Sequence, residues 1–285
     1  MGKVLSRQSP GSAGESTGLP FAEAGSDAPR IPRIVLTGEV NSGKTTLANF
    51  LLQAELLAVD IVPNTLCPTL LRFGDTAHLR VHRADGAVAL RSLADLHRVG
   101  SERVQFIEVY LPSAVLRAIE ILDLPGFVSL ADAEAKRQWV AAADVQIWCT
   151  AATQAWKASE QAKWQSLGCP RNGALLVLTY RDLLPRQQLG EVGERMSRET
   201  QRFFSQWTAI STSQAIAARN PRGEIVREDL WRSTGVEDFI KKLKDLLHGA
   251  MTRGGVSLPA SPVDIFRRPA LLYMRGPVPF ARPRD

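Results

Sequence analysis

Gly38-Glu-Val-Asn-Ser-Gly-Lys-Thr45 is the stretch that decides the fold of this chain. It fits the pattern G-x-x-x-x-G-K-[ST] of a phosphate-binding loop. The stretch lies between an apolar run, Ile34 to Leu36, and a segment with helical spacing, Leu47 to Leu52. Strand, loop and helix therefore come in the order that such a loop requires. We interpret the match as a phosphate-binding loop rather than as a glycine-rich turn that resembles one by chance.

Each residue type in this loop has a physical reason to be there. Gly38 and Gly43 allow backbone conformations that turn successive N–H groups toward an anion, and the helix that follows presents its positive end. Lys44 would reach the β- and γ-phosphates, and the Thr45 hydroxyl would ligate Mg²⁺. The other positions expected to bind the nucleotide here are Glu39, Val40, Asn41, Ser42 and Thr46.

A D-x-x-G sequence begins at the last residue of another expected strand. Ile119-Glu-Ile-Leu-Asp123 is an expected strand, and it leads into Asp123-Leu-Pro-Gly126. Asp123 would hold magnesium through water, and the Gly126 N–H would sense the γ-phosphate. Either residue alone would be an ordinary turn after a strand, so the weight of this element comes from its place after the phosphate loop.

Two further elements are typical of a base-binding site. Leu175 to Leu178 leads into Thr179-Tyr-Arg-Asp182, which is similar to the [NT]-K-x-D element whose carboxylate accepts hydrogen bonds from guanine. In this element Thr179 and Asp182 match the pattern. Ser211 and Thr212 follow the next strand, where a loop would brace the base. All these signals lie at the carboxyl ends of expected strands, where ligands bind in open α/β sheets.

Short apolar runs alternate with amphipathic stretches along the chain. This alternation predicts an α/β fold of the P-loop NTPase class, with a mostly parallel central sheet and helices on both faces. A capping box of Thr234 and Glu237, followed by apolar residues on one helix face, predicts a last helix over 236–248. The expected strands are Ile34 to Leu36, Leu116 to Leu122, Val145 to Trp148, Leu175 to Leu178 and Thr208 to Ile210.

The composition excludes several classes of protein. The chain has 285 residues, 45% of them hydrophobic, which suffices for one sizeable core. Its longest apolar runs are far shorter than the ~20 residues that a spanning helix needs. Residues 252–285 hold six arginines against two aspartates, or +4 of the net +6, so the rest is almost neutral and a nucleic-acid partner is not expected. Three widely spaced cysteines and the lack of an apolar N-terminal block favour a cytoplasmic location.

At these residues the sequence resembles the bacterial dynamin-like GTPases, a branch of the translation-factor-related P-loop GTPases. The resemblance covers about residues 31–250. Besides the phosphate loop, it rests on Ile61-Val-Pro-Asn-Thr-Leu-Cys-Pro-Thr69, which is similar to the Pro-Thr-Thr-containing switch I of that family. It implies that Thr65 is the switch threonine that closes on Mg²⁺ and the γ-phosphate. Asp123 lies 79 residues after Lys44, and dynamin-like domains carry a strand-rich insertion between switch I and the D-x-x-G element.

The chain is expected to have three parts. Residues 1–30 hold few large apolar residues and are expected to form a disordered N-terminal arm. Residues 31–251 would form the dynamin-like GTPase domain, and residues 252–285 a basic tail rich in Pro and Arg. Dynamin-like membrane remodellers continue into a helical stalk. We expect a GTPase that lacks this stalk, and we do not infer membrane fission or fusion.

Three residues depart from the patterns of the family. Tyr180 replaces the lysine of the guanine-recognition element, and Asn64 replaces the first threonine of the switch I pattern. Phe127 stands where Ras-like enzymes place the glutamine that orients the attacking water. Families with an apolar residue here orient water by other means, including a potassium ion held at the position of Asn41. Asn41 also has a structural interpretation, as a loop asparagine in an unusual backbone conformation, and both interpretations stay open.

The leading hypothesis is a slow GTPase that acts as a dynamin-like molecular switch. It would bind GTP with Mg²⁺ and hydrolyse GTP to GDP and phosphate, with Lys44, Thr65 and, on the potassium interpretation, Asn41 as catalytic residues. It would associate across the nucleotide with a second copy or a related GTPase. The alternative is a nucleotide-gated scaffold with negligible hydrolysis, which Phe127 and Tyr180 suggest. A small-molecule kinase is disfavoured, because it would not need the base-recognition element.

The basic tail has two interpretations. Its arginines and the apolar Leu271-Leu-Tyr-Met274 would contact anionic lipid or an acidic protein, and lipid contact would place the protein peripherally at the membrane. Alternatively, the tail is a solvated extension that keeps the protein soluble.

Overall fold

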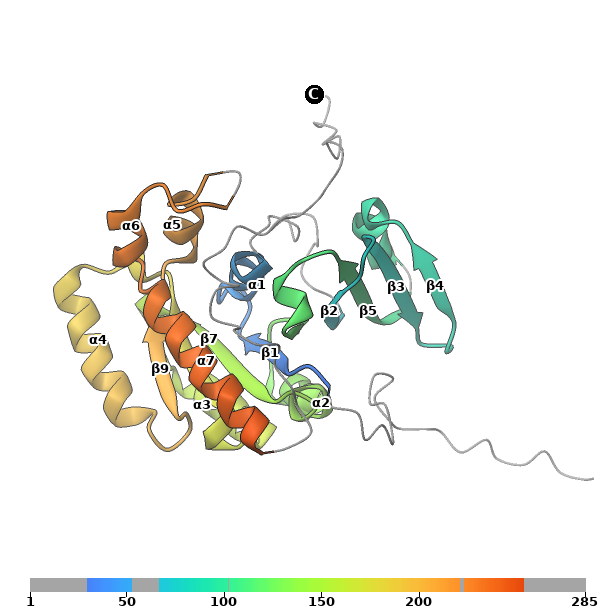
Figure 1. Cartoon of the computed structure of the whole chain (residues 1–285). Helices are drawn as coiled ribbons and strands as arrows, with labels where there is room; N and C mark the ends of the chain where they lie inside the picture. Colours follow the sequence, from blue (N-terminus) through green and yellow to red (C-terminus); the bar gives the residue numbers. More distant parts are fainter. Residues whose placement is uncertain (1–29, 53–66, 102, 221–222, 254–285) are drawn as a thin grey trace, which may run out of the picture.

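The computed structural model describes residues 30–52, 67–101, 103–220 and 223–253 of the chain. Over this range nine strands form a single sheet (Figure 1). Their order across the sheet is β4-β3-β5-β2-β6-β1-β7-β8-β9. The strands are β1 (Arg33–Gly38), β2 (Thr69–Phe73), β3 (His78–Arg83), β4 (Val88–Arg91), β5 (Val104–Leu111), β6 (Glu120–Asp123), β7 (Val145–Ala151), β8 (Ala174–Thr179) and β9 (Gln206–Ala209).

The sheet is mixed and mostly parallel. β1 pairs in parallel with β6 on one side and with β7 on the other, and β8 and β9 continue the parallel pairing. Beyond β6, β2 runs antiparallel to β6 and parallel to β5. The hairpin of β3 and β4 pairs with β5 through β3 and forms the far edge. The predicted fold class is confirmed, and the strands β3 to β5 lie in the insertion that precedes the D-x-x-G element.

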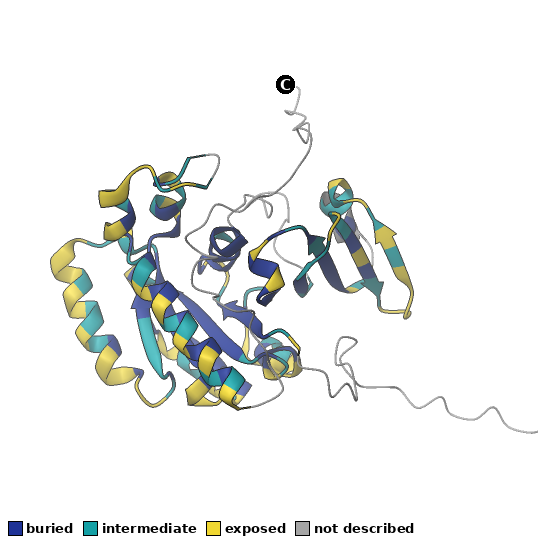
Figure 2. Ribbon diagram, in the orientation of Figure 1, coloured by how far each residue is buried: buried dark blue, intermediate teal, exposed yellow. Residues whose placement is uncertain are grey.

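Helices cover both faces of the sheet (Figure 2). Ile34 and Leu36 of β1 belong to one apolar cluster with α1, α5, α6 and α7, whereas Val35 belongs to a second cluster with α2, α3 and α4. All three side chains are fully buried, as expected of a parallel strand that is covered on both faces. In the described part of the chain, no helix combines the length and the apolar character that crossing a bilayer demands. The helices are α1 (Lys44–Leu52), α2 (Leu130–Ala141), α3 (Ala158–Leu167), α4 (Arg186–Glu199), α5 (Thr212–Ala217), α6 (Glu228–Ser233) and α7 (Val236–Thr252).

The strand expected over Leu116 to Leu122 is shorter in the structure. β6 begins at Glu120, and Val115–Arg117 forms a single 3-10 turn. Leu116 and Ile119 are fully buried although they lie outside the strand. A short apolar run indicates burial but does not distinguish a buried strand from a buried turn.

The last helix begins at Val236, as predicted, but without the predicted capping box. Its N-cap is Gly235, with φ of 77°, which has no side chain to cap the helix. The hydroxyl of Thr234 accepts a hydrogen bond from the Val236 N–H at 3.3 Å and donates to the Trp231 carbonyl at 2.6 Å. The helix continues to Thr252, four residues beyond the predicted end and into the first residue of the expected tail.

A chain of ion pairs crosses five adjacent strands, β1, β6, β2, β5 and β3. Arg33 donates to Glu120 at 2.6 Å, and Arg72 joins Glu120 (2.7 Å) to Glu108 (2.9 Å). The chain ends at His82, whose Nε2 lies 3.1 Å from the Glu108 carboxylate. The side chains of Arg33 and Glu120 are only 7% and 6% exposed. Such a buried ion pair adds little net stability, but removal of one partner leaves the other charge buried and unpaired, which is strongly destabilising.

Replacing Glu120 by Gln is expected to lower the free energy of unfolding by about 3 kcal/mol, because the buried guanidinium group of Arg33 and the partly buried one of Arg72 would then face a neutral amide. Urea denaturation of the purified chain measures this loss. The control is Glu228→Gln, which breaks an exposed pair with Arg232 and should cost less than about 0.5 kcal/mol. Equal losses in the two variants would contradict the importance of the buried chain.

Candidate functional site

The phosphate loop connects β1 to α1 at the carboxyl edge of the sheet. Gly38 has φ of 138°, and a Cβ at this position would lie 2.2 Å from the Cys149 carbonyl oxygen of β7. Only glycine therefore allows β1 to leave the sheet here. Thr179, the last residue of β8, donates from its hydroxyl to the Ser42 carbonyl at 2.9 Å. The loop is held by the two strands that follow β1 across the sheet.

The Lys44 ammonium donates hydrogen bonds to other residues of the phosphate loop. Its Nζ donates to the Glu39 carbonyl at 2.7 Å and to the Ser42 hydroxyl at 3.4 Å, and the residue is buried. Burial lowers the pKa of Lys44, and the nearby Asp123 carboxylate opposes this decrease. The positive end of α1 begins at the same residue, so the ammonium and the helix favour an anion at one place.

Asp123 and Thr45 provide two oxygen atoms beside the loop. The Thr45 hydroxyl donates to Asp123 Oδ2 at 3.5 Å. The other carboxylate oxygen, Oδ1, is buried and has no hydrogen-bond partner among the described residues. Burial raises the pKa of Asp123 to about 6, and Lys44 opposes the increase. A buried carboxylate oxygen that lacks a partner and lies near a hydroxyl fits a hard cation such as Mg²⁺.

The D-x-x-G segment packs directly on the phosphate loop. The Phe127 N–H donates to the Gly38 carbonyl at 3.0 Å. A Cβ on Gly126 would lie 2.7 Å from the Cα of Val40, so glycine is needed for this approach. The Phe127 ring is buried and packs against Trp148, with ring centroids 5.6 Å apart. The ring is therefore part of the core and brings no polar group to the site.

Glu39, the second residue of the loop, is bound by α3 and the residue before it. Lys163 Nζ lies 2.6 Å from the Glu39 carboxylate, Lys157 Nζ lies 2.9 Å from it, and the Ser159 hydroxyl donates to it at 2.9 Å. Burial by itself would raise the pKa of Glu39, but these hydrogen bonds lower it to about 2. Sequence reasoning missed these partners, because no motif links a phosphate loop to residues so far along the chain.

Tyr180 supports the phosphate loop from the base-recognition element. It adopts φ of 55°, and its hydroxyl donates to the Asn41 carbonyl at 3.2 Å. A tyrosine thus contacts the phosphate loop from the position where the guanine-recognition element of the family has a lysine. Asn41 has φ of 60°, in agreement with its structural interpretation. Asp182 lies two residues beyond Tyr180 and is exposed.

The loop after β9 is held in place by contacts of Ser211, including its hydroxyl group. Ser211 is buried and caps α5, because its Oγ accepts a hydrogen bond from the Gln214 N–H at 3.3 Å. Its own N–H donates to the Thr234 carbonyl at 2.9 Å. Thr212 is also buried and is the first residue of α5. These contacts fix the loop at the carboxyl end of β9.

The structure brings most of the predicted site residues to one edge of the sheet. Thr46 is half-buried on α1, next to Thr45. The expected switch threonine, Thr65, lies outside the described residues. The predicted residues of the phosphate loop and its direct neighbours are Gly38, Glu39, Val40, Asn41, Ser42, Gly43, Lys44, Thr45, Asp123, Gly126 and Thr179. Asp182, Ser211 and Thr212 follow the ends of β8 and β9.

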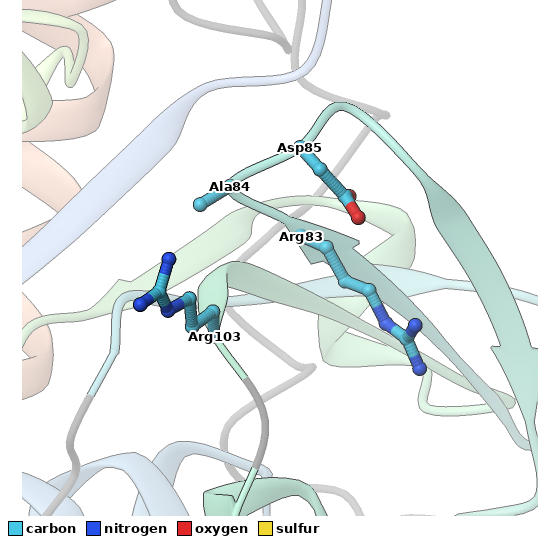
Figure 3. Close-up of a pocket in the computed structure, with 4 residues that line it drawn as sticks. All are labelled: Arg83, Ala84, Asp85 and Arg103. Atoms are coloured by element: carbon cyan, nitrogen blue, oxygen red, sulfur yellow. The ribbon is translucent and has the colours of Figure 1, made fainter.

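A cavity away from this edge shows no comparable chemistry. It has a volume of about 550 Å³ and is lined by Arg83, Ala84, Asp85 and Arg103 beside the turn between β3 and β4 (Figure 3). The two arginine side chains extend in different directions and do not converge on one point. Among the described residues, no group of three or more His, Cys, Asp and Glu side chains is placed to hold a metal ion.

Residues 34–180 match the sequence model of the dynamin family, from β1 to the residue after β8. The chain belongs to the dynamin family. The matched range contains the phosphate loop and the D-x-x-G element, which confirms the resemblance drawn from the residues. It also confirms that the chain carries the P-loop GTPase domain of this family.

One bacterial relative and two chains of known structure are similar to this chain. The chain is 26% identical over 192 residues to Dynamin-like protein 2 of Campylobacter jejuni subsp. jejuni serotype O:23/36 (strain 81-176), a match that covers 64% of this chain and 31% of the relative. Two chains from structures of an oligomerised bacterial dynamin pair, described as sensing and tethering membranes over long range, share the fold with TM-scores of 0.56 and 0.55. They are 19% and 18% identical, over 79% of this chain and 37% and 36% of theirs. The dynamin-family chain thus spans about a third of the length of these relatives.

Tyr180→Phe is expected to weaken nucleotide binding, because the Asn41 carbonyl loses its donor. One hydrogen bond of roughly 1 kcal/mol corresponds to about a fivefold higher Kd for GDP. Titration with a fluorescent GDP measures the change. Tyr110→Phe, in the insertion strand β5, serves as the control and should leave the Kd as in the wild type. If both variants bind GDP equally well, the Tyr180 hydroxyl does not support the loop.

Proposed function

We propose that this dynamin-family chain binds GTP with Mg²⁺ and hydrolyses GTP to GDP and phosphate. The observation that carries the proposal is the packing of the D-x-x-G segment on the phosphate loop, which assembles Lys44, Thr45, Asp123 and Gly126 at one edge of the sheet. The family match supports GTP as the nucleotide.

The residues have separate tasks in this proposal. Lys44 would leave the Glu39 carbonyl and bind the β- and γ-phosphates together with the first N–H groups of α1. Thr45 and Asp123 would hold the magnesium ion, which supplies positive charge at the phosphate oxygens when it is bound. The Gly126 N–H would meet the γ-phosphate. Thr65 would close on the same region, as the resemblance implies.

The base would be recognised at the ends of β8 and β9. Asp182 is exposed, so its carboxylate is available to accept hydrogen bonds from the N–H groups of guanine. The Tyr180 hydroxyl donates to the phosphate loop at Asn41, and Ser211 fixes the neighbouring loop, in which Thr212 is buried. This arrangement supports guanine recognition without the usual lysine.

Slow hydrolysis is part of the proposal. The Phe127 ring is 1% exposed and packs in the core, so the residue after D-x-x-G cannot orient an attacking water. The same observation favours the second candidate function, a nucleotide-gated scaffold with negligible hydrolysis. Multiple-turnover release of phosphate at saturating GTP distinguishes the two functions.

Association through the nucleotide face is proposed from exposed apolar residues. Val40 of the phosphate loop, Val128 after the D-x-x-G segment and Leu183 after the base-recognition element are 46%, 72% and 61% exposed. Their positions around the site suit a second copy of this chain or a related GTPase. Turnover per molecule would then rise with protein concentration.

Two further parts of the hypothesis remain proposals. Asn41 is exposed in the phosphate loop, where a potassium ligand would stand, and turnover in KCl against NaCl at equal ionic strength decides between its two interpretations.

The arm over residues 1–30 and the tail over 252–285 lie almost wholly outside the described residues. We propose a cytoplasmic protein whose tail brings it to anionic lipid or an acidic protein, and the GTPase domain over 31–251 as the folded part.

Lys44→Ala is expected to abolish GTP binding and turnover while the chain stays folded, because the change removes a charge directed at the phosphates and little packing. GTP titration, phosphate release and thermal melting measure the three properties. Lys242→Ala, which removes a lysine of α7, is the control and should bind and turn over GTP as the wild type does. A folded Lys44→Ala protein with unchanged GTP affinity would contradict the phosphate-loop assignment.

Asp182→Asn is expected to shift base preference from guanine toward xanthine, because one of two carboxylate acceptors becomes a donor. The loss of a hydrogen bond to a charged group corresponds to a Kd for GTP that is about 10- to 100-fold higher, with tighter binding of XTP. Competition titrations with GTP and XTP measure both values. Asp229→Asn, on the exposed part of α6, should change neither. Unchanged affinities in Asp182→Asn would place base recognition elsewhere.

A further inference from the structure

One ammonium group joins the two loops of the site. Lys163 of α3 is 7% exposed, and its Nζ lies 2.6 Å from the Glu39 carboxylate and 3.4 Å from the Phe127 carbonyl oxygen. Glu39 is the second residue of the phosphate loop, and Phe127 follows the D-x-x-G sequence directly. No sequence pattern assigns a role to Lys163.

The contact reinforces a place where the two loops already meet. Glu39 and Phe127 face each other in a parallel β-bridge, and the Phe127 N–H donates to the Gly38 carbonyl at 3.0 Å. The Phe127 carbonyl accepts from Lys163. Both backbone polar groups of Phe127 are thus tied to the phosphate loop, one directly and one through Lys163. This fixes the preceding residue, Gly126, against the loop.

The charges strengthen this link. Hydrogen bonds from Lys163 and Lys157 keep the pKa of Glu39 low, at about 2, so the carboxylate is ionised at neutral pH. A bond between an ammonium and a carboxylate is roughly twice as strong as a bond between neutral groups. Because Lys163 is nearly excluded from water, its bond to Glu39 is also less screened than an exposed pair would be.

Lys157 offers a comparison within the same cluster. It also binds the Glu39 carboxylate, at 2.9 Å, but its side chain is 46% exposed, and its Nζ donates to the Gln154 side chain at 3.3 Å rather than to the D-x-x-G segment. The two lysines therefore share one partner and differ in whether they reach Phe127. Any effect that comes from holding Glu39 alone should be common to both.

The link uses side chains other than the lysine that would bind phosphate. Lys44 lies on the Glu39 carbonyl, and in the proposed reaction it leaves this oxygen for the nucleotide. The side-chain contacts of Glu39 with Lys163, Lys157 and Ser159 do not compete with phosphate. They would therefore continue to hold the loop after Lys44 has moved.

We propose that Lys163 is a positioning residue, which holds the D-x-x-G segment against the phosphate loop so that Gly126 meets the γ-phosphate end of the nucleotide. This inference rests on the proposed GTPase function. The proposal predicts different effects on the binding of GDP and of GTP. GDP ends at the β-phosphate and does not need the D-x-x-G segment, whereas the γ-phosphate of GTP needs it. Loss of Lys163 should therefore affect GTP and its turnover much more than GDP.

The test compares Lys163→Met with Lys157→Met. Methionine fills a similar volume without a charge, and Lys157 and Ser159 still hold Glu39 in the Lys163 variant. We expect Lys163→Met to lower kcat about tenfold, or about 1.4 kcal/mol of transition-state stabilisation, and to raise the Kd for a non-hydrolysable GTP analogue about fivefold. Its Kd for GDP should stay within about twofold of the wild type. Lys157→Met should change all three values less than about twofold.

Three more variants, Lys163→Arg, Glu39→Gln and the double variant of Glu39→Gln with Lys163→Met, protect the test against misfolding. Lys163→Arg keeps a charged donor and should keep at least about a third of the wild-type kcat. Glu39→Gln should lower kcat about as much as Lys163→Met, and the double variant should fall little further, because both changes break one link. Thermal melting of each variant shows that it is folded.

The outcomes separate this inference from the GTPase proposal. A wild type that releases no phosphate overturns the GTPase proposal, and the ratio of the Kd values for the GTP analogue and GDP still tests Lys163. Equal kcat and equal ratios in Lys163→Met and Lys157→Met overturn the positioning role. Equal weakening of GDP and the analogue in Lys163→Met also overturns it, because this pattern indicates only a structural role.

Discussion

The hydrogen bond from the Phe127 N–H to the Gly38 carbonyl, 3.0 Å long, joins the two loops on which the site depends. It forms because β1 and β6 lie side by side in parallel, with Leu36 opposite Asp123, and both strands end at one edge of the sheet. The chain leaves each strand through a loop that passes the other closely. Glycine at position 126 is the condition for this closeness, since a Cβ there would lie 2.7 Å from the Cα of Val40, whereas glycine at position 38 keeps β1 clear of the Cys149 carbonyl of β7.

Much of the site was predictable because local residue patterns encode it. A phosphate loop needs its glycines, lysine and hydroxyl within a few residues, and an apolar run before it suffices to identify the strand. The elements after β6, β8 and β9 follow the same rule, so the sequence placed Asp123, Thr179 and Ser211 at strand ends correctly. Local patterns predict the shape of a site whose parts are each a strand followed by a turn.

The contacts that bind distant segments together were not predictable in this way. Arg33 and Glu120 are 87 residues apart, and Glu39 and Lys163 are 124 apart. A buried lysine on α3 and an exposed one look alike in the sequence, because charge pairing between distant elements has no period or spacing. The same limit explains the apolar run around Leu116, where burial was recognised but its local conformation was not.

Two of the three departures from the family's patterns, Tyr180 and Phe127, differ in kind once the geometry is known. Tyr180 exchanges an ammonium for a hydroxyl but keeps a donor directed at the phosphate loop, so a physical task survives a change of residue type. Phe127, in contrast, places an apolar ring where Ras-like enzymes have a polar glutamine side chain. Its ring joins the core beside Trp148, while its backbone N–H and carbonyl bind the phosphate loop and Lys163. The contribution of Phe127 to the site is therefore made by its peptide groups.

These restraints have a common consequence for nucleotide binding. Hydrogen bonds from Thr179, Tyr180 and Lys163 hold the phosphate loop at Ser42, Asn41 and Glu39, and each donor belongs to an element outside the loop. The loop therefore has little order left to gain when a nucleotide arrives, which favours binding because less conformational entropy is lost. In the proposed reaction, the main local exchange is the movement of Lys44 from the Glu39 carbonyl to the phosphates. Burial disfavours the charge of Lys44, as its lowered pKa indicates. The Glu39 carbonyl oxygen that the ammonium now contacts is neutral, whereas a phosphate would give it an anionic partner. The rigid loop and the buried lysine thus favour the same event, the arrival of an anion.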